Sequence, residues 1–166
     1  MSFVRIALIA ATILLGVGCK HHDDSIYTMS DFQFVEQVNQ ELFYQQQLHQ
    51  ALQNLADVKL LNLGARRQDG IDRYYRELKM ATPNISWPSP VLSVYHQNQL
   101  RVLAESGMGY QERLFDMLME TDETMIAFHV KAIGQGGLQN ANLRIWADNK
   151  INDLQQNLKE TQALKP

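Results

Sequence analysis

The feature that most constrains the fold is an apolar pattern with the period of an α-helix, which returns in several long stretches of the chain. The first stretch shows heptad spacing, and no stretch alternates with period two as a half-buried strand does. In this first stretch the residues that share one helix face, which we call its seam, are Val35, Val38, Leu42, Leu52 and Ala56, with Gln45 and His49 among them. The pattern predicts an all-α protein in which each helix buries one face.

Capping signals place the first two helices. Ser30 and Gln33 have the spacing of a capping box, which predicts a helix that begins there and reaches about Ala56. Asp57 is expected to cap a second helix that ends at about Met80. Its predicted inward face consists of Leu61, Gly64, Ile71, Tyr75 and Leu78, with Gln68 among them.

Prolines mark the break that follows. Three prolines between positions 83 and 90 exclude a continuing helix, because proline lacks the amide hydrogen that a helix interior needs. Ser89 and Pro90 have the order of an N-cap and first helical residue, which predicts a short helix from Val91 to about Glu105.

Glycine and asparagine residues mark where the last two helices are expected to begin. Gly107 and Gly109 are expected to turn the chain before a long helix from about Tyr110 to Ile133, and Asn140 is expected to cap the final helix. Their predicted seams are Leu114, Leu118, Met125, Phe128 and Ala132, then Ala147, Ile151, Leu154, Leu158 and Thr161. The predicted architecture is an antiparallel four-helix bundle with a short extra helix in the crossover.

Residues 1–19 have the composition of a secretion signal. Arg5 precedes an apolar run that is shorter than the roughly 20 residues of a permanent membrane span. Cys19 is the only cysteine, so an intramolecular disulfide is excluded. The junction resembles the lipobox of bacterial lipoproteins, with Gly16 where that family prefers Leu. This resemblance implies a lipid anchor on Cys19, with fatty acids such as palmitate; the alternative is an ordinary secretory peptide with an incidental thiol.

Residues 20–29 predict a polar tether, followed by a helical domain at 30–166. His21 to Asp24 are four potential metal ligands in a row, but a flexible segment must be ordered on binding, so we interpret them as a solvated linker. Lys20 stands where Gram-negative lipoproteins retained in the inner membrane carry Asp. By that resemblance we expect an outer-membrane lipoprotein of the bacterial envelope that faces the periplasm.

The charge pattern excludes an obvious class of partner. Removing Arg5 with the signal changes the formal net charge from −3 to about −4, and the remaining basic residues are scattered among acids. We therefore expect no nucleic-acid partner. The expected partners are the membrane, through the lipid anchor, and a protein of the envelope.

Six short segments between roughly residues 31 and 164 share a helical pattern with a known family: 58–61, 76–78, 114–116, 122–128, 153–158 and 162–164. They resemble a bacterial envelope family known as domain of unknown function 4142. The resemblance implies a ferritin-like four-helix bundle without an established activity. Family members carry Asp-His pairs in the second and third helices and a histidine near the end of the fourth. Here the corresponding residues are Gln68-Asp69, Asp122-Glu123 and Asn157.

A metal site is the main chemical alternative. Ferritin-like di-iron sites use Glu-x-x-His, and the residues three positions before His49 and His129 are Gln46 and Ile126. A weaker set of mixed oxygen and nitrogen ligands for a divalent metal remains. It consists of Glu41, His49, Asp122, Glu123 and His129. The competing interpretation is that these side chains form local hydrogen bonds at the edge of the bundle.

Three functional hypotheses follow. The first is a non-enzymatic envelope lipoprotein that acts as a structural or interaction module, with no catalytic residue and no cofactor. The second is a divergent ferritin-like metal-binding or stress-related periplasmic protein. The third is binding of an apolar ligand or partner helix by the adaptable side chains of Met117, Met119 and Met125, which core packing explains equally well. The serines at positions 86, 89 and 93 are expected to cap helices or form turns.

Overall fold

The structure is a computed structural model that describes residues 26–166, and these residues form a helical protein. Its elements are α1 (Asp31–Gln53), α2 (Val58–Ala81), α3 (Val94–Ala104), the 3-10 helix η2 (Gly107–Gly109), α4 (Tyr110–Ile133) and α5 (Ala141–Leu164). The prediction of an all-α protein is confirmed. The predicted signal peptide with Cys19 lies outside the described residues, as does the tether up to residue 25.

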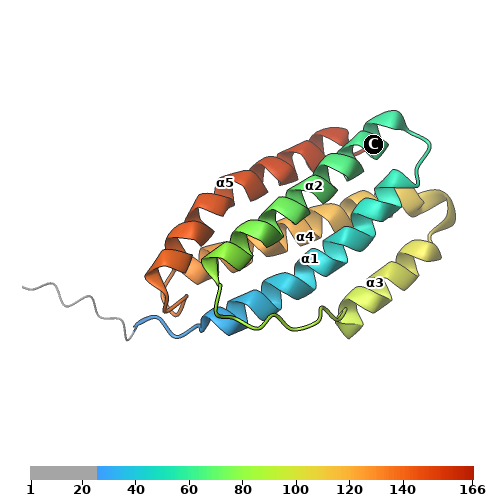
Figure 1. Cartoon of the computed structure of the whole chain (residues 1–166). Helices are drawn as coiled ribbons and strands as arrows, with labels where there is room; N and C mark the ends of the chain where they lie inside the picture. Colours follow the sequence, from blue (N-terminus) through green and yellow to red (C-terminus); the bar gives the residue numbers. More distant parts are fainter. Residues whose placement is uncertain (1–25) are drawn as a thin grey trace, which may run out of the picture.

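The four long helices pack side by side, and each contacts two of the others (Figure 1). α1 contacts α2 and α4, while α5 contacts α4 and α2. Figure 1 shows that α2 and α4 run away from the end that holds the C-terminus, whereas α1 and α5 run toward it. Each long helix is therefore antiparallel to both of its neighbours. None of the described helices combines the length and apolarity that crossing a bilayer requires.

Three helix starts follow the local signals in the sequence. Ser30 and Gln33 form the predicted capping box, Asp57 accepts hydrogen bonds from the amides of Lys59 and Leu60, and Asn140 caps α5 in the same way. Such caps satisfy amide groups that have no partner inside the helix. The bounds of α2 and α4 and the start of α5 fall within one or two residues of the predicted ones.

The crossover differs from the prediction. α3 begins at Val94, and its N-cap is Ser93, whose hydroxyl accepts from the amide of His96 at 3.1 Å. The segment around Pro88 and Pro90 is not helical, and the Pro88 carbonyl accepts a hydrogen bond from the Asn39 side chain at 2.8 Å. The prediction of a helix start at Ser89 and Val91 was wrong because this tertiary contact ties the segment to α1 outside a helix.

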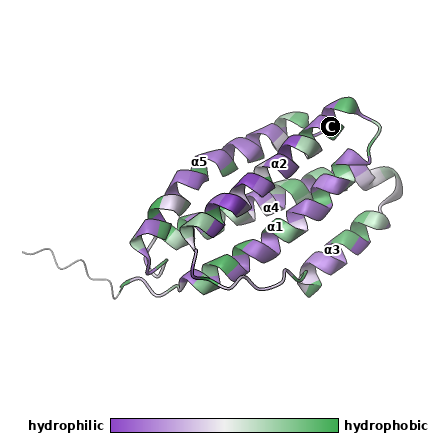
Figure 2. Ribbon diagram, in the orientation of Figure 1, coloured by the Kyte–Doolittle hydropathy of each residue, from purple (hydrophilic) through white to green (hydrophobic). Residues whose placement is uncertain are grey.

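Two inward faces also differ in detail. Leu61 of α2 is 44% exposed, and the neighbouring Leu60 and Leu63 are buried in its place. α1 ends at Gln53, so the predicted seam residue Ala56 lies in the exposed connection to α2. Figure 2 shows hydrophobic and hydrophilic residues alternating along every helix, as expected for helices that each bury one face.

The bundle interior consists of two apolar clusters with a polar layer between them. One cluster includes Phe34, Val38, Leu42, Ile71, Leu78, Met125, Ala147 and Leu154. The other includes Leu48, Leu52, Leu60, Leu63, Leu114, Phe115 and Leu118. The buried side chains of the polar layer are Glu41, Gln45, Arg67, Thr121, Asp122 and Thr161. Polar groups in such a place need partners, because burying them without one costs free energy.

Residues 26–29 are attached to the loop between α4 and α5. The Met29 amide donates to Gly137 at 2.9 Å, and the Met29 carbonyl accepts from Gln139 at 3.0 Å. The Arg144 guanidinium lies over the ring of Tyr27, with its Cζ atom 3.7 Å from the ring centroid. The last part of the predicted tether is thus packed on the end of the bundle opposite the C-terminus (Figure 1).

Candidate functional site

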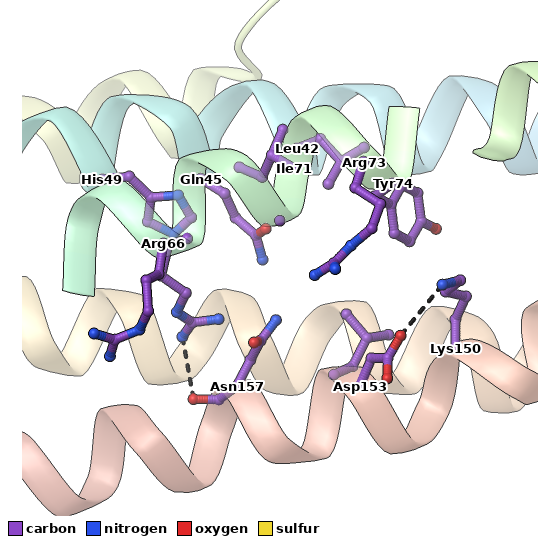
Figure 3. A pocket seen from close by; sticks show the side chains of 13 residues that line it. Leu42, Gln45, His49, Arg66, Ile71, Arg73, Tyr74, Lys150, Asp153 and Asn157 are labelled. Atoms are coloured by element: carbon purple, nitrogen blue, oxygen red, sulfur yellow. Dashed lines mark hydrogen bonds and ion pairs between the residues drawn. The ribbon is translucent and has the colours of Figure 1, made fainter. Parts of the chain in front are cut away.

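The strongest candidate site is a cavity between α2 and α5, which we call the α2–α5 groove (Figure 3). Its volume is about 90 Å³, and α1 forms its floor. A buried water needs about 10–15 Å³ of such volume, so the groove has room for roughly six waters or one small polar group. The lining residues are Leu42, Gln45, His49, Arg66, Arg67, Gly70, Ile71, Arg73, Tyr74, Lys150, Asp153, Leu154 and Asn157.

Two polar side chains of α1 face the groove without protein partners. His49 is 1% exposed, and neither of its ring nitrogens forms a hydrogen bond in the described structure. The Nε2 group of Gln45 is also buried without a partner. Buried polar groups are almost always hydrogen-bonded, so each exception calls for an explanation. Both side chains lie on the predicted α1 seam, where the sequence placed them.

The electrostatics of the groove keep His49 neutral. Burial, with a further contribution from the Arg67 guanidinium, lowers the pKa of His49 to about 3. A neutral imidazole carries one N–H donor and one acceptor nitrogen. At neutral pH His49 therefore offers the groove one ring N–H donor, and no protein atom among the described residues accepts a hydrogen bond from it.

Arg67 projects from α2 into the polar layer and joins three helices. Its guanidinium binds both carboxylate oxygens of Asp122 on α4, and it also contacts the Thr161 hydroxyl of α5. Two parallel hydrogen bonds between guanidinium and carboxylate are a strong arrangement. Burial raises the pKa of Asp122, while Arg67 and Thr161 oppose that shift. The Nε atom of Arg67 is buried and has no partner, so it adds another free donor beside the groove.

Cationic side chains surround the opening of the groove. Lys150 of α5 forms ion pairs with Glu77 and Asp153, and Arg66 lies 3.8 Å from Glu160. Arg73 of α2 has no ion pair among the described residues, and Figure 3 shows it pointing toward the space between the two helices. The groove thus combines one unpaired cation with buried donors.

The structure does not gather the predicted metal ligands. Glu41 binds the Thr121 hydroxyl and faces His96, Asp122 is occupied by Arg67, and Glu123 is exposed on the outer side of α4. Within residues 26–166 no three His, Cys, Asp or Glu side chains form a group that could hold a metal ion.

His129 belongs to an aromatic cluster in the first apolar core. Its Nδ1 lies 2.7 Å from the carbonyl of Met125 and its Nε2 lies 2.8 Å from the Tyr74 hydroxyl. Because a carbonyl only accepts, Nδ1 carries the hydrogen and Tyr74 donates to Nε2. Burial lowers the pKa of His129 to about 4. Both ring nitrogens of His129 are therefore hydrogen-bonded. This agrees with the competing interpretation from the sequence, in which these polar side chains form local hydrogen bonds.

Sequence reasoning missed the role of Arg67. An arginine in a polar stretch of α2 is usually exposed, and its partner Asp122 is 55 residues away in the sequence. The one available signal was the position of Arg67 four residues before Ile71, which places it on the inward face of the helix.

Comparison of the chain with protein-family models, curated proteins and solved structures gives no match.

Proposed function

We propose that this protein is a non-enzymatic lipoprotein of the bacterial envelope whose helical domain binds a small oxyanion, such as a phosphate or carboxylate group, in the α2–α5 groove. The observation that carries the proposal is the set of buried donors without partners at one cavity: the imidazole of His49, Nε2 of Gln45 and Nε of Arg67. An anion bound there would accept from these donors and face the cation of Arg73.

The size of the groove supports a small ligand group. About 90 Å³ is far below the several hundred Å³ typical of pockets that enclose a whole cofactor. Because the groove opens to solvent beside Arg66 and Arg73, only the charged end of a larger ligand needs to enter it.

The fold proposal is a ferritin-like bundle, akin to the envelope family that the sequence resembles. It is supported by two antiparallel helix pairs, α1 with α2 and α4 with α5, joined by one long crossover that contains α3. Ferritin-like folds have one such crossover. The Asp-His pairs of that family are absent here, so the proposal concerns the scaffold and not its metal chemistry.

The anchor proposal rests on the lipobox-like junction at Cys19. Residues 26–29 attach to the end of the bundle, so an anchor upstream would hold that end of the domain near the outer membrane. Cys19→Ala should abolish labelling of the protein by a palmitate analogue and release the domain into the soluble periplasm. Persistent labelling would refute acylation at Cys19.

Calorimetric titration of the folded domain with inorganic phosphate and with acetate tests the binding proposal. Binding of either should weaken about tenfold or more in Arg73→Ala and in His49→Leu, because each variant removes a donor to a charged group. Arg76→Ala, an exposed arginine on the same helix away from the groove, is the matched control and should bind normally. His49→Leu removes a polar group without partners, so its stability should be kept. Equal affinity in all variants would contradict the proposal.

A further inference from the structure

A second cavity lies between α1, α3 and α4, and we call it the α3 pocket. Its volume is about 270 Å³, three times that of the α2–α5 groove. The residues that carry the argument are Glu41 and Tyr44 of α1, Tyr95 and His96 of α3, and Glu120 and Phe128 of α4. Among the described residues that line it there is no lysine or arginine, so its formal charge is set by two carboxylates.

Glu41 is a buried carboxylate with two close polar neighbours, the Thr121 hydroxyl and the His96 imidazole. It is 4% exposed, accepts a hydrogen bond from the Thr121 hydroxyl, and lies 3.4 Å from Nε2 of His96. Burying a carboxylate is costly unless hydrogen bonds and an opposite charge compensate it. The Thr121 hydroxyl supplies a hydrogen bond, but it supplies no charge.

Aromatic rings form a second wall of the α3 pocket. The rings of Tyr44 and His96 are stacked, with centroids 4.1 Å apart and planes 3° apart, and Tyr95 lies edge-on to His96. The Tyr95 hydroxyl donates to Glu120, which places the second carboxylate on this side of the pocket. Aromatic faces beside carboxylates attract cations, because the ring face and the carboxylate both carry negative potential.

The Tyr44 hydroxyl is an independent observation that points to a ligand in the α3 pocket. Tyr44 is 3% exposed, lines the pocket, and its hydroxyl is buried without a hydrogen-bond partner in the described structure. Burial, with a further contribution from the negative charges of Glu120 and Glu41, raises the pKa of Tyr44, so the hydroxyl stays protonated. A buried hydroxyl of this kind needs a partner inside the pocket.

From this arrangement we infer that the α3 pocket binds a small organic ammonium, with a primary amine preferred over a quaternary one. A primary ammonium has three N–H donors, which match the carboxylates of Glu41 and Glu120 and the oxygen of Tyr44. A quaternary ammonium has no such donors and would contact only the rings and the charges. This site is separate from the α2–α5 groove, since the two cavities share no lining residue.

The test is calorimetric titration of the domain with 1,4-diaminobutane and, separately, with tetramethylammonium at pH 8. The diamine should bind about tenfold or more tightly than tetramethylammonium, because only the diamine donates hydrogen bonds. Glu41→Gln should weaken diamine binding by about tenfold or more, and Tyr44→Phe should weaken it less. Asp148→Asn, which changes an exposed carboxylate on α5, is the matched control and should bind like the unchanged domain.

A fold readout keeps the test decisive. Far-ultraviolet circular dichroism should be unchanged in each variant, and if Glu41→Gln fails to fold, Glu120→Gln replaces it because Glu120 is exposed. Absence of diamine binding by the folded domain would overturn the inference. Equal binding by Glu120→Gln, Tyr44→Phe and the control would overturn it as well.

Discussion

The α2–α5 groove and the α3 pocket share one helix, α1, yet they present opposite chemistry. The groove places His49 and Gln45 beside the arginines of α2, and its free groups are donors. The pocket places Glu41 and Tyr44 beside α3 and α4, and its charged groups are carboxylates. About two turns of α1, from Glu41 to His49, therefore serve two sites. The helix that packs against each side decides which charge that site prefers.

The two regions also differ in what they contribute to the bundle. At the groove, Arg67 joins α2, α4 and α5 through a buried ion pair, whereas at the pocket Glu41 contacts α4 through one hydroxyl and α3 through one imidazole. We infer that the groove is tied to the stability of the whole bundle. The pocket depends instead on α3, which lies outside the four long helices (Figure 1).

The largest expected effect is a loss of stability that distinguishes Arg67 at the groove from Glu41 at the pocket. Arg67→Ala should lower the free energy of unfolding by about 3–5 kcal/mol, because it leaves the Asp122 carboxylate buried without its cation. Glu41→Gln should lower it by only about 1 kcal/mol, because the amide oxygen can still accept from Thr121. Urea denaturation of both variants measures the difference.

A double variant checks the cause of that loss. In Arg67→Met combined with Asp122→Leu, both charges of this ion pair are removed together, so most of the lost stability should return. Equal losses in Arg67→Ala and Glu41→Gln, or no recovery in the double variant, would contradict the distinction between the two regions.

The next effect is a loss of stability in acid. The folded-state pKa values of His49 and His129 are about 3 and 4, below the ordinary value of 6.5. The unfolded chain therefore takes up these protons first as the pH falls below 6.5. Between pH 6 and 4 each histidine should reduce the free energy of unfolding by about 1.4 kcal/mol per pH unit.

His49→Leu isolates the contribution of the groove. Its stability should depend less steeply on pH than that of the unchanged domain, by about 1.4 kcal/mol per pH unit in the same range. Urea denaturation at several pH values gives both slopes. Identical slopes would mean that His49 is not held neutral by its surroundings.

The smallest expected effects come from two glycines of α2. A Cβ atom at Gly64 would lie 2.9 Å from the backbone oxygen of His49, while one at Gly70 would meet nothing within 4 Å. Gly64→Ala should destabilise the domain by about 1–3 kcal/mol, because it pushes α2 away from the groove floor on α1. Gly70→Ala should stabilise it by about 0.5–1 kcal/mol through helix propensity alone. Thermal unfolding of the two variants shows whether each substitution raises or lowers the stability of the domain. A change in the same direction for both would be evidence against the close approach at Gly64.

The parts of the fold that were predictable are those that local chemistry determines. The caps at Ser30, Asp57 and Asn140 act within three residues of themselves, and the sequence alone located them. Ser89 and Ser93 offer the same local signal, and the choice between them follows from the contact between Asn39 and Pro88, which lie 49 residues apart. Such a contact has no local signature.

The sequence could identify the buried polar residues of the candidate sites, but it could not predict which of them contact each other. The buried polar residues Glu41, His49 and Asp122 could be found from helix periodicity, since they share faces with apolar neighbours. Which helix faces which decides that Asp122 meets Arg67, and that Glu41 turns toward α3. α1 and α4 do pack against each other, as the hypothesis of a shared metal site required, but the Asp122 carboxylate binds Arg67 and the predicted ligands do not meet.

The most direct test of the account is a nitrogen-15 histidine spectrum of the domain, recorded by NMR during titration with phosphate and then with 1,4-diaminobutane. We predict that phosphate shifts the ring signals of His49 and not those of His96, and that the diamine shifts His96 and not His49. Shifts of both histidines by either ligand, or of neither by both, would contradict the assignment of two separate sites with opposite charge preference.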